Sequence, residues 1–299
     1  MNISPTFSII IPTYNHGHLI SKCLQSLLDQ TLTSWEAIVV NNFSDDDTIS
    51  VVHGFADPRI QLINFRNNGI IAASRNEGLR RSSGAYIAFL DSDDWWYPEK
   101  LEVVQNAMAR ADVVHHDCDV YTTRGKQLLK LRGRQLKKPV FVDLMTRGNP
   151  VINSSVCVRQ AILKKAGGFS EEPALVSMED FDLWLRIAQI TEEFAHIPRV
   201  LGAYWVWEGN VSKSPERFIS TYPVIMNRYK DRLQPDDRKE AENFESYCIS
   251  IRKLYQARYT EGRQLLYRSV RSKNADTMLK SLARIALSFP QQAISFFAR

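Results

Sequence analysis

Residues 85–94 read AYIAFLDSDD, a mostly apolar run of six residues followed by three carboxylates within four positions. A short, continuous apolar run of this kind predicts a strand buried on both faces of a sheet. In open α/β sheets, ligands bind at the carboxyl ends of the strands, which is where Asp91, Asp93 and Asp94 would lie. We therefore expect residues 85–90 to form a central strand and the chemistry of the protein to follow it directly.

The sequence before this strand alternates between strand and helix patterns. Apolar runs predict strands at Phe7–Ile11, Ala37–Val40 and Ile60–Phe65, and helical periodicity predicts helices at His18–Leu28, Thr48–Phe55 and Ile70–Arg81. This alternation predicts right-handed crossovers and a mostly parallel, Rossmann-like α/β sheet with helices on both faces. The second strand also ends in a polar stretch, Asn41–Asp47, which would lie at the same edge of the sheet.

The pattern changes twice further along the chain. From about Asp112 to Tyr204 it becomes less regular, with an amphipathic helix predicted around Phe181–Ile190. Beyond Ser214 nearly every segment reads as helix. We place a domain boundary near residues 210–215, which gives a first domain over residues 1–212 and a helical extension over residues 213–299.

The net charge of +5 is concentrated in this extension. Residues 213–299 contain 17 Lys/Arg against 9 Asp/Glu, whereas residues 1–212 contain 21 against 24. A near-neutral body with a basic tail indicates two regions with different partners. The basic charge comes without a nucleic-acid recognition motif, so we do not expect nucleic acid among those partners.

The sequence favours a cytosolic chain with reduced cysteines. Its four cysteines are far apart and form no CxxC pair, which argues against a zinc site or a disulfide framework. No apolar run approaches the ~18–20 residues that a spanning helix requires. Residues 1–7 lack the basic region and apolar stretch of a signal peptide.

The three carboxylates after the fourth strand admit two interpretations. Like charges at this spacing repel one another, and Mg²⁺ or Mn²⁺ would relieve the repulsion with help from substrate phosphates. Alternatively, the segment is a solvated turn in which Asp94 caps a helix opened by residues 95–100. On these residues alone, both interpretations stay open.

Four ordered motifs over about residues 7–212 resemble the family 2 glycosyltransferases, which share the GT-A fold. They are SIIIPTYN (8–15), VVNNFSDDDT (39–48), a third group made of Asn68-Gly69, Ala73–Asn76, Gly84 and Leu90–Asp94, and a fourth made of Gly167–Phe169 and EDFDLWLR (179–186). The resemblance implies an inverting, metal-dependent transferase of the bacterial polysaccharide-biosynthesis type. It also implies a nucleotide-sugar half at about residues 1–111 and an acceptor half at about residues 112–212.

The resemblance assigns a donor site to the strand ends. Asp91 and Asp93 would form the DxD motif, in which Asp93 binds Mn²⁺ or Mg²⁺ across the donor's two phosphates and Asp91 shares the metal or reaches the ribose. The remaining donor contacts would come from Pro12, Thr13, Tyr14, Asn41, Arg75 and Ser92. For Arg75, a solvated surface arginine is the alternative.

Two positions depart from the family pattern. The family usually has Asp where this chain has Asn41, so the base is open: a UDP-sugar is the default donor, with guanosine or thymidine as alternatives. An amide can donate and accept, so the change is compatible with base recognition. Many relatives carry a metal-assisting His near residues 204–210, where this chain has Trp207.

By the same resemblance, Asp180 would act as general base on the acceptor hydroxyl, with Glu179 as the second candidate. The structural alternative is that both carboxylates cap the following helix, whose positive N-terminus favours them. Asp182 and Arg186 fit an i,i+4 helical pair. Trp95 and Trp96 could pack in the core or form an apolar platform for an acceptor sugar; we expect Trp96 to be buried and Trp95 to be exposed. We expect His115 and His116 to be structural, because adjacent strand residues point to opposite faces.

We therefore expect transfer of a sugar to a hydroxyl of a saccharide or lipid-linked saccharide, in surface or exopolysaccharide synthesis. The rivals are a non-catalytic sugar-nucleotide-binding member of the fold and a sugar nucleotidyltransferase. For the basic tail, one reading is an amphipathic element on the inner face of an anionic membrane. The other is a helical appendage that packs on the catalytic domain or on another subunit.

Overall fold

The computed structural model describes residues 4–207 and 214–297, with side chains described as far as residue 289. It divides into two compact units. The α/β unit contains Met1–Lys137, Pro150–Pro173 and Glu179–Gly209, and the helical unit contains Lys138–Asn149, Ala174–Met178 and Asn210–Arg299. Two short internal segments thus belong with the C-terminal helices. The boundary near residues 210–215 stays a prediction.

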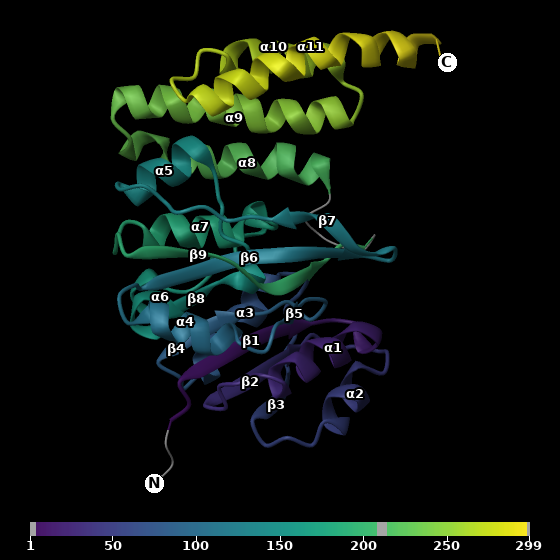
Figure 1. The fold of residues 1–299 in the computed structure, drawn as a ribbon, viewed down its shortest axis with the longest axis vertical. Helices are drawn as coiled ribbons and strands as arrows, with labels where there is room; N and C mark the ends of the chain where they lie inside the picture. The colour runs from purple at the N-terminus through teal and green to yellow at the C-terminus, as the bar shows by residue number, and fades with distance from the viewer. Residues whose placement is uncertain (1–3, 208–213, 298–299) are drawn as a thin grey trace. The chain divides into compact units, whose positions relative to one another are not determined.

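The α/β unit is built on one nine-stranded sheet in the order β3-β2-β1-β4-β8-β6-β9-β5, with β7 paired to β6 (Figure 1). The strands are β1 (Phe7–Thr13), β2 (Trp35–Asn41), β3 (Ile60–Asn64), β4 (Tyr86–Phe89), β5 (Trp95–Trp96), β6 (Val113–Thr122), β7 (Gly125–Leu131), β8 (Cys157–Arg159) and β9 (Phe194–Trp205). Strands β1 to β4 are parallel to one another. Beyond β4 the sheet is mixed: β6 and β9 are parallel, and the other pairs are antiparallel.

The parallel part of the sheet follows the predicted alternation closely. Every residue of β1 and β2 is buried, as their apolar runs predict. The helices of this unit are α1 (Gly17–Leu28), α2 (Thr48–Gly54), α3 (Ile71–Arg81), α4 (Lys100–Met108), α6 (Gln160–Ala166) and α7 (Glu179–Ile187), with a 3₁₀ turn at Asn153–Ser155. The apolar side of α1 packs with β1 and β2 in one core cluster. The predicted α/β fold is confirmed, with a mixed rather than mostly parallel sheet.

The segment after the carboxylates is a strand, so the alternative in which Asp94 caps a helix is wrong. Residues 95–96 form β5 against β9, and α4 begins only at Lys100. Asp94 is buried, and its Oδ1 accepts a hydrogen bond from the backbone N–H of Trp205 at 2.8 Å. Asp94 therefore fastens the end of β9 to the turn that follows β4.

Trp95 is 7% exposed, so the expectation of an exposed platform is also wrong. Its ring lies 4.8 Å from that of Tyr121, and Lys22 Nζ sits 3.2 Å from its centroid. Trp96 is buried, as predicted. The two tryptophans thus complete the packing of β5 rather than line an open surface.

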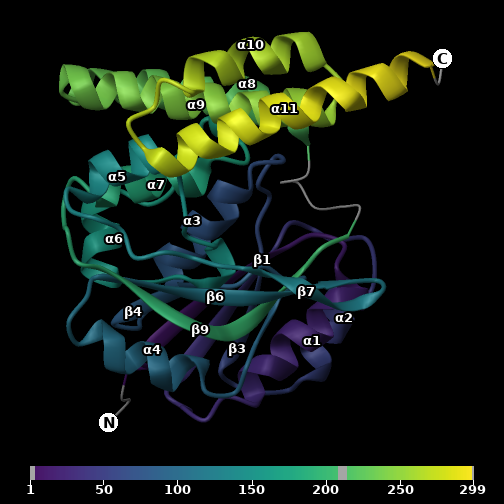
Figure 2. The same ribbon diagram turned by 45° about the horizontal axis from the view of Figure 1, so that its top comes forward.

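The helical unit confirms the helical reading of the tail. It contains α5 (Val140–Arg147), α8 (Pro215–Tyr229), α9 (Pro235–Tyr255), α10 (Tyr259–Ser269) and α11 (Ala275–Phe297), with a 3₁₀ turn at Lys230–Arg232; a further 3₁₀ turn lies at Pro173–Leu175. Helix α9 packs against α5, α8 and α10, and α10 packs against α11 (Figure 2). Among the described residues, no helix is both long and apolar enough to cross a bilayer. All four cysteines are free thiols.

Gly84 provides a test of the tight packing before β4. A Cβ at this position would lie 2.6 Å from the backbone N of Ser8 and 2.8 Å from the carbonyl carbon of Phe7. Because backbone atoms of a buried strand cannot move aside cheaply, Gly84→Ala should destabilise the protein by about 1–3 kcal/mol. Chemical denaturation measures this effect. The control is Gly54→Ala, which meets no atom within 4 Å and should change stability by no more than about 0.5 kcal/mol. Equal stability of the two variants would contradict the packing described here.

Candidate active site

Arg75 joins two acidic segments that lie far apart in the sequence. Its Nη2 donates to Asp91 Oδ1 at 2.9 Å, and its Nη1 donates to Glu179 Oε1 at 2.8 Å. Only 4% of Arg75 is exposed, so the alternative of a solvated surface arginine is wrong. The DxD segment after β4 and the acidic start of α7 therefore share one guanidinium.

The electrostatics of Arg75 explain why it can be buried. Burial alone would lower its pKa, but the neighbouring Asp91 and Glu179 carboxylates raise the pKa above its usual value. A buried charge is tolerated when it is paired and hydrogen-bonded, whereas removal of one partner is strongly destabilising. The guanidinium and its two carboxylates thus stabilise one another as a group.

Asp180 lies beside this group, in the first turn of α7. Its Oδ1 accepts a hydrogen bond from the backbone N–H of Phe181 at 2.6 Å. Burial, together with the nearby charge of Glu179, raises the pKa of Asp180 to about 7, although Arg75 acts in the opposite direction. A carboxyl group with a pKa near neutrality is suited to accept a proton under physiological conditions. The helix begins at Glu179, so the negative charges of Glu179 and Asp180 also stabilise its positive N-terminal end.

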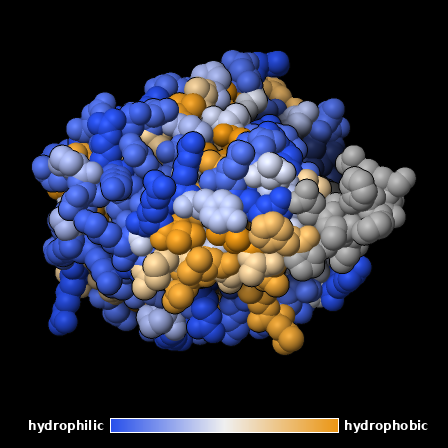
Figure 3. All heavy atoms as spheres, turned by 90° about the horizontal axis from the view of Figure 1, so that it is seen from above, coloured by the Kyte–Doolittle hydropathy of each residue, from blue (hydrophilic) through white to orange (hydrophobic). Residues whose placement is uncertain are grey.

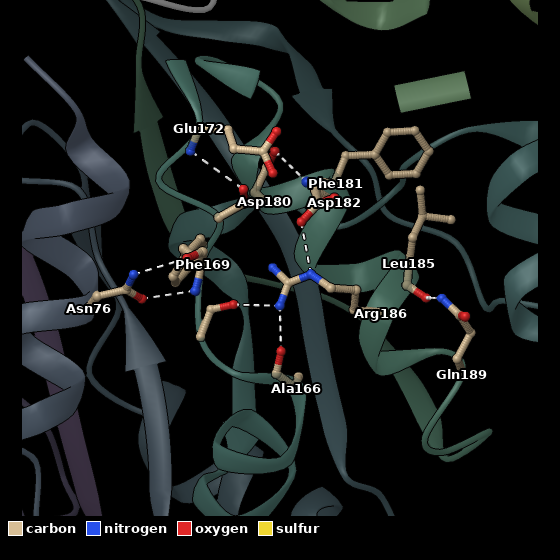
Figure 4. A network of polar contacts seen from close by, with 12 residues as sticks. Asn76, Ala166, Phe169, Glu172, Asp180, Phe181, Asp182, Leu185, Arg186 and Gln189 are labelled. Atoms are coloured by element: carbon tan, nitrogen blue, oxygen red, sulfur yellow. Dashed lines mark hydrogen bonds and ion pairs between the residues drawn. The ribbon is translucent and has the colours of Figure 1, made fainter. Parts of the chain in front are cut away.

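Helix α7 is anchored at its far end by Arg186 (Figure 4). The Nε of Arg186 donates to Asp182 Oδ2 at 2.8 Å, which confirms the predicted i,i+4 pair. Its Nη1 donates to the carbonyl oxygens of Ala166 and Gly168. These bonds fix α7 against the turn that follows α6, so the position of Asp180 depends on this turn.

The same turn is clamped to α3 by Asn76, the neighbour of Arg75 (Figure 4). Asn76 Nδ2 donates to the carbonyl of Phe169 at 2.9 Å, and its Oδ1 accepts from the N–H of Phe169 at 2.8 Å. A Cβ on Gly168 would lie 2.6 Å from Asn76 Oδ1, and Gly168 has a φ of +73°. Glycine is required here both for the backbone conformation and for the close approach. Residues of the third and fourth motifs thus hold each other in place.

Asp93 is the second carboxylate of the DxD segment, and it contacts Trp207. Trp207 Nε1 donates to Asp93 Oδ2 at 3.0 Å. Burial and the charge of Asp91 raise the pKa of Asp93 to about 6. The indole thus lies against the carboxylate of Asp93. Trp207 is the position where we expected a departure from the family pattern.

His16 is a residue of this site that the sequence reasoning missed. Its Nδ1 lies 2.7 Å from Ser92 Oγ, and its ring packs edge-on against Trp207 with centroids 5.6 Å apart. His16 lies in the turn between β1 and α1. Because β1 neighbours β4 in a parallel arrangement, the turns after the two strands meet at one sheet edge. That rule, applied to His16 and Ser92, would have placed them together.

The carboxylates fit a cation that takes part of its ligands from substrate. Among the described residues, no group of three or more His, Cys, Asp or Glu is arranged to hold a metal. Asp91 and Asp93 alone suit Mg²⁺ or Mn²⁺ when phosphates and water complete the shell. The pKa of Asp93 is raised first by burial and then by the charge of Asp91, and a bound cation would offset both effects. His115 and His116 are fully buried and belong to no metal-binding group of this kind.

The expected base-and-ribose residues lie at the ends of β1 and β2. Pro12 and Thr13 are buried, whereas Tyr14 is half exposed. Asn41 is fully buried: its Nδ2 donates to Asn64 Oδ1 at 2.7 Å, and its Oδ1 accepts from Ser44 Oγ at 2.5 Å. Asn41 therefore builds the turn after β2. A direct contact with the base stays a prediction for this residue.

Comparison with known proteins agrees with this geometry. The sequence model of "Glycosyl transferase family 2" matches residues 8–165. TuaG of Bacillus subtilis (strain 168), a glycosyltransferase provisionally assigned to teichuronic acid biosynthesis, is 30% identical over 190 residues, or 62% of this chain and 73% of TuaG. WfgD of Escherichia coli, a UDP-Glc:alpha-D-GlcNAc-diphosphoundecaprenol beta-1,3-glucosyltransferase, is 42% identical over 106 residues, or 36% of this chain and 42% of WfgD.

Solved structures share the fold at lower sequence identity. S. aureus TarS 1–349 in complex with UDP-GlcNAc superposes with a TM-score of 0.63 at 18% identity, covering 96% of this chain and 92% of TarS 1–349. The mannosyltransferase PcManGT of Pyrobaculum calidifontis, in complex with GDP-Man and Mn²⁺, gives 0.62 at 18% identity, covering 99% and 84%. These two likenesses establish the GT-A fold alone. Since the family model matches more than half of the sequence and TuaG matches along most of its own length, the chain belongs to glycosyltransferase family 2.

Proposed function

We propose that this chain is a metal-dependent, inverting glycosyltransferase that moves a sugar from a nucleoside-diphosphate sugar to an acceptor hydroxyl. The observation that carries the proposal is the pair of hydrogen-bonded ion pairs that Arg75 makes with Asp91 and Glu179. These ion pairs bring Asp91, a carboxylate suited to a donor metal, and the helix start that carries the candidate base Asp180 to the same guanidinium. We assign the transferase chemistry to residues 1–212 and an accessory role to the helical extension, residues 213–299.

The donor is proposed to be a UDP-sugar, with the base left to experiment. The names of TarS, PcManGT and WfgD mention UDP-GlcNAc, GDP-Man with Mn²⁺, and UDP-Glc, respectively. Asp91 and Asp93 would hold a divalent cation, which when bound neutralises charge on the departing diphosphate. The base and ribose would be held by Pro12, Thr13, Tyr14, Asn41 and Ser92.

Asp180 is proposed to take the proton of the acceptor hydroxyl, with Glu179 as its charged neighbour. The hydroxyl oxygen attacks the anomeric carbon from the face opposite the diphosphate, so one C–O bond forms as the bond to the phosphate oxygen breaks. The products are an inverted glycoside and a free nucleoside diphosphate. Burial, and after it the charge of Glu179, raises the pKa of Asp180 to about 7, which suits a base that works near neutral pH.

The acceptor is proposed to be a saccharide or lipid-linked saccharide in the synthesis of a surface or exopolysaccharide. WfgD is named for a diphosphoundecaprenol-linked acceptor, and TuaG is associated with teichuronic acid. Since an acceptor linked to a polyprenyl lipid would lie in a membrane, we propose that the enzyme works at the inner face of a membrane.

Replacing Asp180 tests the proposed base. Asp180→Asn should lower the transfer rate by about 10²–10⁴ because a positioned general base contributes that much. Donor binding should be unchanged, and the melting temperature should not fall, since Asn removes a carboxylate whose charge is disfavoured by burial. In the wild type, transfer should rise with pH through about 7, because the base must be ionised to accept a proton.

Two outcomes of this experiment bear on the assignment. The matched control, Asp29→Asn at the exposed residue directly after α1, should keep full activity and the same pH profile. Full activity in Asp180→Asn would remove Asp180 from the proposed role. A wild type that binds a sugar nucleotide but transfers nothing at any pH would favour the non-catalytic rival.

Metal dependence can be measured through ligand-induced stabilisation. With UDP, GDP, TDP and CDP tested separately, one nucleotide should raise the melting temperature of the wild type, and only with Mn²⁺ present. Asp93→Asn should abolish the Mn²⁺-dependent part of this shift. No response to any nucleotide, or an unchanged response in Asp93→Asn, would contradict the proposed donor site.

A further inference from the structure

Helix α11 of the helical unit has an inverted burial pattern. Its packed side carries small polar residues: Thr277, Ser281 and Ser288 are each 2% exposed or less. Its opposite side carries large apolar residues, Leu279, Leu282, Leu287 and Phe289, which are 47% to 59% exposed. In an ordinary surface helix the apolar stripe faces the core.

The packed side of α11 is held by specific contacts. Ser281 Oγ lies 2.8 Å from Ser269 Oγ of α10, and both serines are fully buried. Ser281 Oγ also donates to the carbonyl of Thr277. The helix thus lies closely against α10 through its small residues. Because these small residues face α10, the large apolar residues on the opposite side of α11 face outward.

The outward residues form one continuous apolar band. Leu279, Leu282 and Phe289 are spaced i, i+3 and i+10, which places them on one side of the helix, and Leu287 widens that side. At ~1.5 Å per residue, the band is about 15 Å long. Figure 3 shows hydrophobic side chains gathered on the face of the molecule seen from above.

Basic residues outnumber acidic ones in the segment that carries this band. Residues 256–289 contain seven Lys/Arg and two Asp/Glu. Arg268, Arg271 and Arg284 are exposed, and none of them makes an ion pair within the part of the chain that the structure describes. This part of the helical unit therefore combines a linear apolar band with an excess of exposed positive charge.

We propose that the outward side of α11, with Arg268, Arg271 and Arg284, is a docking surface for an anionic lipid bilayer. The helix would lie in the interface, with its apolar band among the acyl chains and the arginines at the headgroups. A second copy of the chain fits less well, because a symmetric contact would set the same arginines against one another. This inference extends the proposed function by placing the enzyme where a lipid-linked acceptor is found, but it does not depend on the transfer chemistry.

Vesicle co-sedimentation of the full chain tests this surface. Wild-type protein should sediment with vesicles of phosphatidylcholine and phosphatidylglycerol, and not with phosphatidylcholine alone. The triple variant Leu282→Ser/Leu287→Ser/Phe289→Ser should lose at least about tenfold in vesicle affinity because it removes the inserting side chains. Arg268→Gln/Arg271→Gln/Arg284→Gln should lose the preference for anionic vesicles and its sensitivity to salt.

The chain offers a matched control in another exposed apolar pair. Leu128 and Leu129 of β7 are 103% and 70% exposed, so Leu128→Ser/Leu129→Ser removes apolar surface from the α/β unit. This variant should bind vesicles as the wild type does. All variants should keep the wild-type melting temperature and its shift with nucleotide and Mn²⁺, which separates a failure of docking from a failure of the proposed function.

Two results would overturn the proposal. The first is wild-type binding that is absent, or equal for neutral and anionic vesicles. The second is a dimer in light scattering that the α11 apolar variant converts to monomer, because the band would then be covered by a second copy.

Discussion

The geometry of the α/β unit depends on the two ion pairs of Arg75. The guanidinium comes from α3, Asp91 from the turn after β4, and Glu179 from the start of α7, with N–O distances of 2.9 and 2.8 Å. Breaking a buried pair of this kind costs about 3–5 kcal/mol, because the remaining partner is left charged and unpaired. The next residue, Asn76, clamps the turn on which α7 depends. Two consecutive residues of α3 therefore hold both Asp91, the proposed donor carboxylate, and the helix that carries the candidate base.

The same region concentrates carboxyl groups whose ionisation is unfavourable. Asp93 and Asp180 have pKa values raised to about 6 and about 7, and burial raises the pKa of Asp94 well above its usual value. Each of these carboxyl groups is harder to ionise in the folded protein than in water, which lowers stability. A fold selected for stability alone would therefore not gather them. Functional sites are where such arrangements are retained. One of the three, Asp94, serves the backbone of β9, so a raised pKa alone does not identify a catalytic group.

The sequence predicted the elements that depend on local patterns. Apolar runs located β1 to β4, and the polar residues after β2 and β4 marked the edge where the site lies. It did not predict the mixed half of the sheet, because the pairing of β8, β6, β9 and β5 is set by contacts between distant segments. For the same reason the sequence left a helix cap open for Asp94, and it wrongly predicted an exposed ring for Trp95. The contacts of Trp207 with Asp93 and of His16 with Ser92 also join residues more than 70 positions apart.

The central claim is that Arg75 makes the donor carboxylate and the base-bearing helix into one site. A double-mutant cycle between Arg75→Met and Glu179→Gln, followed by the free energy of unfolding, tests this claim most directly. The two side chains share a buried, charge-assisted hydrogen bond. We therefore predict that the double variant loses about 1–3 kcal/mol less unfolding free energy than the two single variants lose in total. Effects that add to within about 0.5 kcal/mol would show that the two side chains act independently, and would contradict the account.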